Sequence, residues 1–272
     1  GTNKMTAEQL KQEYYKLACD YTISVSNDEI NVSLSGLSEN MAKAVALTDN
    51  FMQNAKVDKE AYNLWVESEL KARQDNKKNQ ESNFRTLTAY GIYGDYNSRR
   101  NNPSSEELKS CNPQQLTDLI KSLNGYKHEL LYYGPMELNQ FTAAIDKCHK
   151  TPKTLNNVPE GKPYTKQLTQ KNEILIAPYK AKNIYMTQYH NGGKQYDPKN
   201  APLNAMFNEY FGGGMNTVVF QELREARGLA YSAWAGYYTP EKKNEPEYFC
   251  TNIISQNDKM MDCVRTFNSI MD

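Results

Sequence analysis

The sequence lacks the features that would place it among nucleic-acid-binding or membrane proteins. Its 272 residues include 32 basic and 32 acidic side chains, so the electrostatic attraction that nucleic-acid binding needs is missing. The mean hydropathy is −0.81, and no apolar run approaches the roughly 18 residues of a membrane-spanning helix. We therefore expect a globular chain that binds neither nucleic acid nor membrane.

Cysteine pairs at short spacing are also missing. The five cysteines are odd in number and widely separated: Cys19, Cys111, Cys148, Cys250 and Cys263. This pattern argues against a disulfide framework and against a thiolate metal site. Buried free thiols are the expectation.

Two common active-site motifs are absent as well. No Gly-x-Ser-x-Gly elbow occurs, so a serine nucleophile has no support. The glycine triplet at Gly212, Gly213 and Gly214 lacks the Gly-Lys-Ser/Thr ending of a phosphate loop, which argues against nucleotide binding.

Residues 210–237 are the most informative stretch. Glycine tolerates positive φ and close backbone approach, so the triplet at 212–214 predicts a loop. Apolar residues then recur at helical spacing from Val218 to Ala226, with charged residues between them, as in an amphipathic helix. Gly228 is placed to end that helix. Small and aromatic residues from Leu229 to Tyr237 favour a strand.

This stretch resembles the second, zinc-free repeat of the pitrilysin/insulinase family of zinc metallopeptidases. The resemblance rests on a glycine-rich turn, a helix ending in LREARGLAYS, and an arginine and tyrosine seven positions apart, Arg224 and Tyr231. It implies that the chain is a zinc-free fragment straddling two repeats of a longer peptidase.

The resemblance also implies roles for these residues. Arg224 and Tyr231 would contact the substrate backbone near the scissile bond, since a guanidinium and a phenol can donate hydrogen bonds to a peptide carbonyl. The glycine triplet at 212–214 would admit an extended peptide, and the strand at 229–237 could pair with one. The plainer alternative is a solvated helix arginine and a strand aromatic.

A complete peptidase of this family would hold zinc through an inverted His-x-x-Glu-His helix. The sequence contains no such element: His128, His149 and His190 have no second histidine four positions away. We therefore expect no metal site in this chain, ordinary structural or surface histidines, and zinc only in the complete enzyme.

The remaining pattern predicts two related domains. A helix beginning after Thr6 precedes a hairpin of 21–26 and 30–35 around Asn27, Asp28 and Glu29. Further strands are predicted at 128–134, 173–178 and 183–190, and a helix at 201–211 with Leu203, Met206, Phe207 and Tyr210 inward. Both halves contain a helix, a Leu-Ala pair, two strands and a helix, which indicates an internal repeat.

We thus predict an α+β fold of two α/β sandwich-like domains, each a mostly antiparallel sheet with helices on one face. The first repeat would span 1–150, a proline-containing linker 151–170, and the second repeat 171–272, both repeats being incomplete.

The predicted function is the substrate-binding portion of a zinc metalloendopeptidase, inactive when isolated. Its partners would be a peptide substrate and a zinc-bearing half in the same chain or in a partner subunit. The alternatives are an inactive scaffold subunit of a peptidase complex and a peptide-binding module.

Overall fold

The computed structural model describes residues 1–26, 29–240 and 245–272. Contacts divide the chain into two compact units. The first comprises Gly1–Leu70 and Pro103–Pro163, and the second comprises Lys71–Asn102 and Tyr164–Asp272. Residues 71–102 thus pack with the second unit. The predicted boundaries at 150 and 170 divide the chain into sequence repeats, not into packed units, and they stay a prediction.

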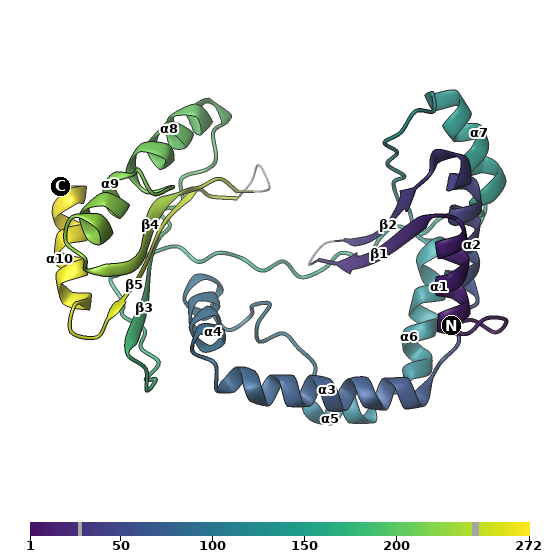
Figure 1. Cartoon of the computed structure of the whole chain (residues 1–272), viewed down its shortest axis with the longest axis horizontal. Coiled ribbons are helices and arrows are strands. Elements are labelled where there is room, and N and C mark those ends of the chain that lie inside the picture. Colours follow the sequence, from purple (N-terminus) through teal and green to yellow (C-terminus); the bar gives the residue numbers. More distant parts are fainter. Residues whose placement is uncertain (27–28, 241–244) are drawn as a thin grey trace. The chain divides into compact units, whose positions relative to one another are not determined.

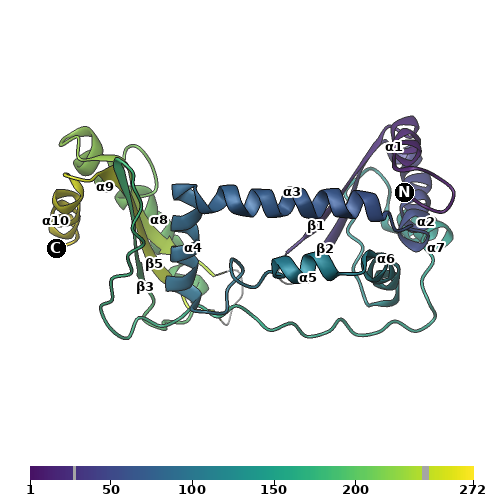
Figure 2. The same ribbon diagram turned by 90° about the horizontal axis from the view of Figure 1, so that it is seen from below.

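The first unit is a two-stranded hairpin with helices (Figure 2). Helix α1 (Ala7–Lys16) begins after Thr6 as predicted, at a capping box formed by Thr6 and Gln9. Strands β1 (Cys19–Val25) and β2 (Ile30–Gly36) pair antiparallel from Cys19 opposite Gly36 to Val25 opposite Ile30. The helices and turns that complete the unit are η1 (Ser38–Asn40), α2 (Met41–Gln53), the first part of α3 (Lys59–Lys77), α5 (Ser105–Ser110), α6 (Pro113–Ser122), η2 (Leu123–Gly125) and α7 (Leu138–Cys148).

The hairpin of the first unit is confirmed. The part of its predicted turn formed by Asn27 and Asp28 lies outside the described residues.

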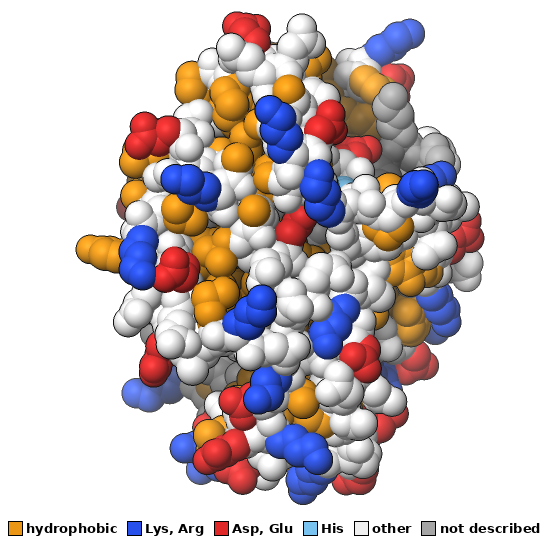
Figure 3. All heavy atoms as spheres, turned by 90° about the vertical axis from the view of Figure 1, so that its right-hand side faces the viewer, with side chains coloured by type: hydrophobic (Ala, Val, Ile, Leu, Met, Phe, Trp, Pro, Cys, Tyr) orange, Lys and Arg blue, Asp and Glu red, His pale blue; other side chains and the backbone are white. Residues whose placement is uncertain are grey.

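A small core holds the first unit together. Leu10, Tyr14, Cys19 and Ala44 form its buried cluster. The Tyr14 hydroxyl shares a 2.7 Å hydrogen bond with the Thr48 hydroxyl, and burial raises the pKa of Tyr14. On the face drawn in Figure 3, acidic and basic side chains are interspersed with hydrophobic ones, as a zero net charge would suggest.

The second unit is built on a three-stranded antiparallel sheet of order β3-β5-β4 (Figure 1). Its strands are β3 (Asn183–His190), β4 (Ala230–Tyr238) and β5 (Tyr248–Gln256). The helices and turns of this unit are α4 (Gln80–Tyr93), η3 (Pro198–Asn200), α8 (Ala201–Phe211), α9 (Val218–Phe220), the π-helical η4 (Gln221–Glu225) and α10 (Met260–Met271).

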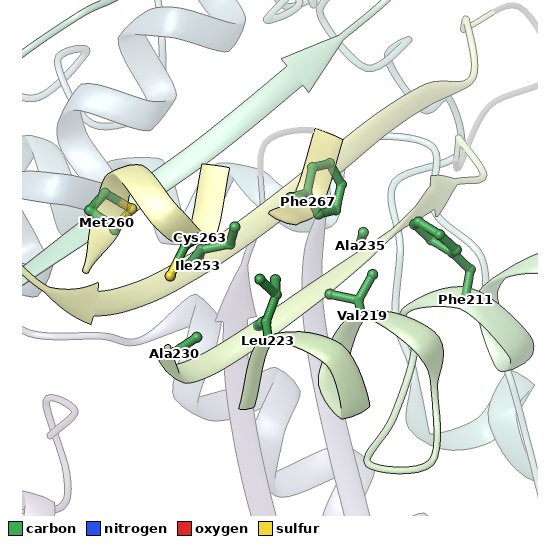
Figure 4. Close-up of a cluster of buried hydrophobic side chains, with 10 residues drawn as sticks. Phe211, Val219, Leu223, Ala230, Ala235, Ile253, Met260, Cys263 and Phe267 are labelled. Carbon is green, nitrogen blue, oxygen red and sulfur yellow. The ribbon is translucent and has the colours of Figure 1, made fainter. Parts of the chain in front are cut away.

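The core of the second unit lies between the sheet and its helices. Figure 4 shows side chains of α8, α9, η4 and α10 meeting those of β4 and β5. Val219, Leu223, Ile253 and Cys263 have no exposed surface. Fully buried aliphatic side chains contribute about 1.5–3 kcal/mol each relative to exposed ones, so this cluster fixes the helix that carries Arg224.

Three local predictions are wrong. Residues 128–134 and 173–178 form no strand in the described structure, and Leu131 and Ile174 are 93% and 87% exposed. Apolar residues become a strand only where a neighbouring strand completes the hydrogen bonds. On α8, Leu203 and its neighbours Met206 and Tyr210 point to solvent rather than inward.

The predicted fold class is confirmed: the chain combines helices with antiparallel sheets. In the second unit α8, α9 and α10 pack on one face of the sheet, and Phe84 of α4 packs against Tyr185 on the other. Helix, two antiparallel strands and helix follow one another in both units, as α1, β1, β2 and α2 and as η4, β4, β5 and α10. Among the described residues, no helix is both long enough and apolar enough to cross a bilayer.

Candidate functional site

Arg224 lies in a local departure from α-helical geometry. In η4 the Ala226 amide donates to the Gln221 carbonyl, five residues back, at 2.8 Å. Such single π turns widen a helix and are frequent at functional sites. Leu223 is fully buried in the core, whereas the Arg224 side chain is 45% exposed. The apolar neighbour therefore anchors the turn and leaves the guanidinium in solvent.

Tyr231 lies at a second irregularity, near the start of β4. The pairing of β4 with β5 shifts between Ala230 and Ser232, so Tyr231 is the extra residue of a β-bulge. Bulges redirect a side chain relative to the regular sheet. Tyr231 is 73% exposed, whereas its neighbour Ala230 is buried. The phenol of Tyr231 therefore lies in solvent and outside the core.

The structure brings Arg224 and Tyr231 together. The guanidinium carbon of Arg224 lies 6.0 Å from the centroid of the Tyr231 ring and 4.9 Å from that of Phe220. The charge partner of Arg224 is Glu225, with Nε 3.7 Å from Oε1. Exposed cation–π contacts are worth about 0.5–1 kcal/mol, so the two rings orient the guanidinium without sequestering its donors.

Tyr231 borders a hollow of about 300 Å³ that is also lined by Gly228, Leu229 and Lys259. The Lys259 ammonium donates to the Gly228 carbonyl at 3.1 Å, and Gly228 has a φ of +58°. The hollow thus has a phenol and an ammonium on its border, both able to donate hydrogen bonds to a carbonyl or carboxylate.

The glycine triplet lies at a different place along β4. Gly212 packs against the β4 backbone so closely that a Cβ there would be 2.2 Å from the Ala235 oxygen. Gly212 and Gly213 border a second hollow of about 290 Å³ with Trp234 and Tyr238. Burial raises the pKa of Tyr238. Of the candidate site residues, Tyr231 therefore borders one hollow and Gly212 and Gly213 border another, both along β4.

The outer edge of β4 is partly occupied by its own chain. The Ala235 amide donates to the Gly212 carbonyl at 3.2 Å. Asn208 of α8 bonds both backbone groups of Tyr237: its Nδ2 donates to the carbonyl at 2.9 Å and its Oδ1 accepts from the amide at 2.8 Å. The Asn208 side chain thus makes the two hydrogen bonds that a neighbouring strand would make with Tyr237. No sequence signal predicts this role, since an asparagine on a helix is typical of any solvated face.

The described residues do not fit a catalytic zinc ion. No group of three or more His, Cys, Asp or Glu side chains within 1–26, 29–240 and 245–272 could hold a metal, whereas a catalytic zinc site needs three protein ligands and an open position.

Comparison with known proteins gives one family. A family model described as "Peptidase M16 inactive domain" matches residues 110–272, more than half of the chain. A search of curated proteins finds no match.

Several solved structures share the fold. The peptidase M16 inactive domain from Pseudomonas fluorescens is 16% identical, with a TM-score of 0.70 over 99% of this chain and 66% of its own. The ferredoxin protease FusC, solved with Arabidopsis ferredoxin, is 12% identical with a TM-score of 0.76, over 99% and 29%. The periplasmic protease PqqL from Escherichia coli is 11% identical with a TM-score of 0.73, over 100% and 30%. The chain thus spans less than a third of the length of these two proteases.

Proposed function

Because the chain belongs to the family of peptidase M16 inactive domains, we propose that it is the zinc-free, substrate-binding portion of a zinc-dependent metalloendopeptidase. The zinc ion would be held by another portion, in the same polypeptide or in a partner subunit. In this proposal the present chain positions the peptide and carries out no bond cleavage by itself.

The observation that carries the proposal is the proximity of Arg224 and Tyr231. Their side chains are both accessible and 6.0 Å apart, measured from guanidinium carbon to ring centroid. A forked guanidinium and a phenol at that spacing can donate to one peptide carbonyl or to two adjacent ones. Donors directed at the oxygen that gains charge lower the barrier to acyl transfer.

The two hollows support an extended ligand rather than a small molecule. Tyr231 borders one and Gly212 and Gly213 border the other. Tyr231 and Ala235 are four residues apart on β4, which corresponds to about 13 Å of strand. An extended peptide of about four residues would reach from the donors at Tyr231 to the glycine hollow. The complex of the 12%-identical FusC with ferredoxin makes proteins a reasonable class of substrate.

A direct test measures binding and cleavage separately. The purified chain, with and without added zinc, is mixed with unstructured peptides carrying a fluorophore, and anisotropy and cleavage are both followed. We expect binding without cleavage. Zinc-dependent cleavage of the peptide by this chain alone would contradict the proposal that peptide-bond hydrolysis takes place in another portion of the peptidase.

The matched variants are Arg224→Ala and Tyr231→Phe, with Arg227→Ala as control. Arg227 lies in the turn that follows η4 and pairs with Glu222 at 3.1 Å. Weaker binding in the first two variants only would support the proposal. Absence of peptide binding in every protein would instead favour the alternative of an inactive scaffold subunit.

A further inference from the structure

Two histidines that are far apart in the sequence meet in the first unit. The Nε2 atoms of His128 and His149 are 2.9 Å apart, although 21 positions separate the residues. His128 follows the turn at the end of α6, and His149 is the residue that ends α7. The two ring planes are nearly perpendicular, at 83°.

The partners of the other ring nitrogens fix where the protons lie. His128 Nδ1 is 2.7 Å from the Tyr126 carbonyl oxygen, which can only accept, so Nδ1 donates. His149 Nδ1 lies 2.8 and 3.0 Å from the two carboxylate oxygens of Asp49, so it donates too. A neutral imidazole that donates from Nδ1 presents a lone pair at Nε2.

Two neutral imidazoles would therefore direct lone pairs at each other across 2.9 Å. That arrangement is repulsive unless a proton or a metal ion lies between the two nitrogens. Histidines that bind a metal commonly donate their second nitrogen to a carboxylate or a backbone carbonyl, which are the partners of His149 and His128. The contact therefore has the outer hydrogen bonds of a metal site.

We propose that His128 and His149 form a two-imidazole binding site for a borderline divalent ion such as Zn²⁺ or Cu²⁺. Imidazole nitrogen suits both ions, and water would complete the coordination. Zinc–nitrogen bonds of about 2.0–2.1 Å at a tetrahedral angle place two nitrogens about 3.4 Å apart. His128 is exposed and has room to withdraw by that small amount.

Asp49 is a positioning residue in this site. Its side chain is 21% exposed and that of His149 only 14%, and the Asp49 carboxylate also accepts from the Lys150 amide at 3.2 Å. The carboxylate thus holds one ring in place and supplies a negative charge near the ion. With two protein ligands in place of the three of a catalytic zinc centre, the site differs from a peptidase zinc centre and does not rest on the proposed function.

The test is a titration of the chelator-treated chain with Zn²⁺ by calorimetry, and with Cu²⁺ by electron paramagnetic resonance. We expect one equivalent of each ion and nitrogen hyperfine splitting from Cu²⁺. His128→Gln and His149→Gln should each weaken binding at least about tenfold, and Asp49→Asn by about 10–100-fold. His190→Gln, which alters the histidine of β3, is the matched control and should bind normally.

Circular dichroism verifies that each variant is folded. No stoichiometric binding below about 1 mM metal, or equal binding by the wild type and both histidine variants, would overturn the proposal. Nuclear magnetic resonance of the imidazole nitrogens gives a further test. A proton shared between His128 and His149 that added zinc does not displace would overturn the proposal as well.

Discussion

The guanidinium carbon of Arg224 lies 6.0 Å from the ring centroid of Tyr231, and each residue occupies an irregular position in its own element. Arg224 lies in a π turn and Tyr231 at a β-bulge. A regular helix and a regular strand would orient both side chains differently. The proximity of the two donors therefore depends on both irregularities.

Removing either donor should lower turnover in a complete enzyme that contains this chain. We expect Arg224→Ala and Tyr231→Phe to reduce kcat/KM by about 100-fold, since one donor to a developing oxyanion is worth about 3 kcal/mol. Zinc content, measured by atomic absorption, should stay constant. Arg227→Ala is the control, and normal turnover of both test variants would refute the assigned roles.

Adding a methyl group at Gly212 should destabilise the second unit. The new Cβ of Gly212→Ala would be 2.2 Å from the Ala235 oxygen and 2.6 Å from its nitrogen, so backbone must move at a cost of about 1–3 kcal/mol. Gly214→Ala, whose Cβ would meet nothing within 4 Å, should change the free energy of unfolding by less than about 0.5 kcal/mol. Equal effects in urea denaturation would contradict the close approach.

Truncating Leu223 should loosen the support of Arg224. Leu223 is fully buried, and Leu→Ala in a core costs about 2–5 kcal/mol. In a Trp65→Phe background the remaining tryptophan is Trp234 of β4, so its fluorescence reports unfolding of the second unit alone. Leu203→Ala alters a leucine that is 66% exposed and should have little effect. A stable Leu223→Ala protein would show that the core is not what fixes this turn.

Stability should fall at alkaline pH through Cys250. Burial raises the pKa of this thiol to about 11, from a usual value of 9.0. Above pH 9 the unfolded chain loses the proton while the folded chain keeps it, so the contribution is complete below about pH 9 and is lost as pH rises toward 11. We expect Cys250 to account for about 1 kcal/mol of the loss between pH 8 and pH 10.

The measurement compares urea unfolding at both pH values in the wild type and Cys250→Ala. The variant should lose less stability with rising pH. Cys111→Ala, a substitution at a less buried thiol, is the control. Identical pH slopes in the wild type and Cys250→Ala would contradict the assignment.

Local sequence signals predicted much of the fold. The helix that begins after Thr6, the antiparallel hairpin and the helix at 201–211 all occur as expected. In each case the signal is a short-range one: a side chain bonding a nearby amide, or apolar residues repeating with the period of the element. Residues 128–134 and 173–178 have the composition of strands, but they lie where the described structure offers no strand to pair with.

By itself, the sequence determined the family resemblance, the residues Arg224 and Tyr231, and the element that carries each. Only the tertiary structure decided that these two side chains are adjacent, that Asn208 and Gly212 cover part of the β4 edge, and that His128 meets His149. Periodicity reports which face of an element is apolar. The distance between side chains on different elements is set by packing, by bulges and by turns, and these depend on contacts between residues far apart in the chain.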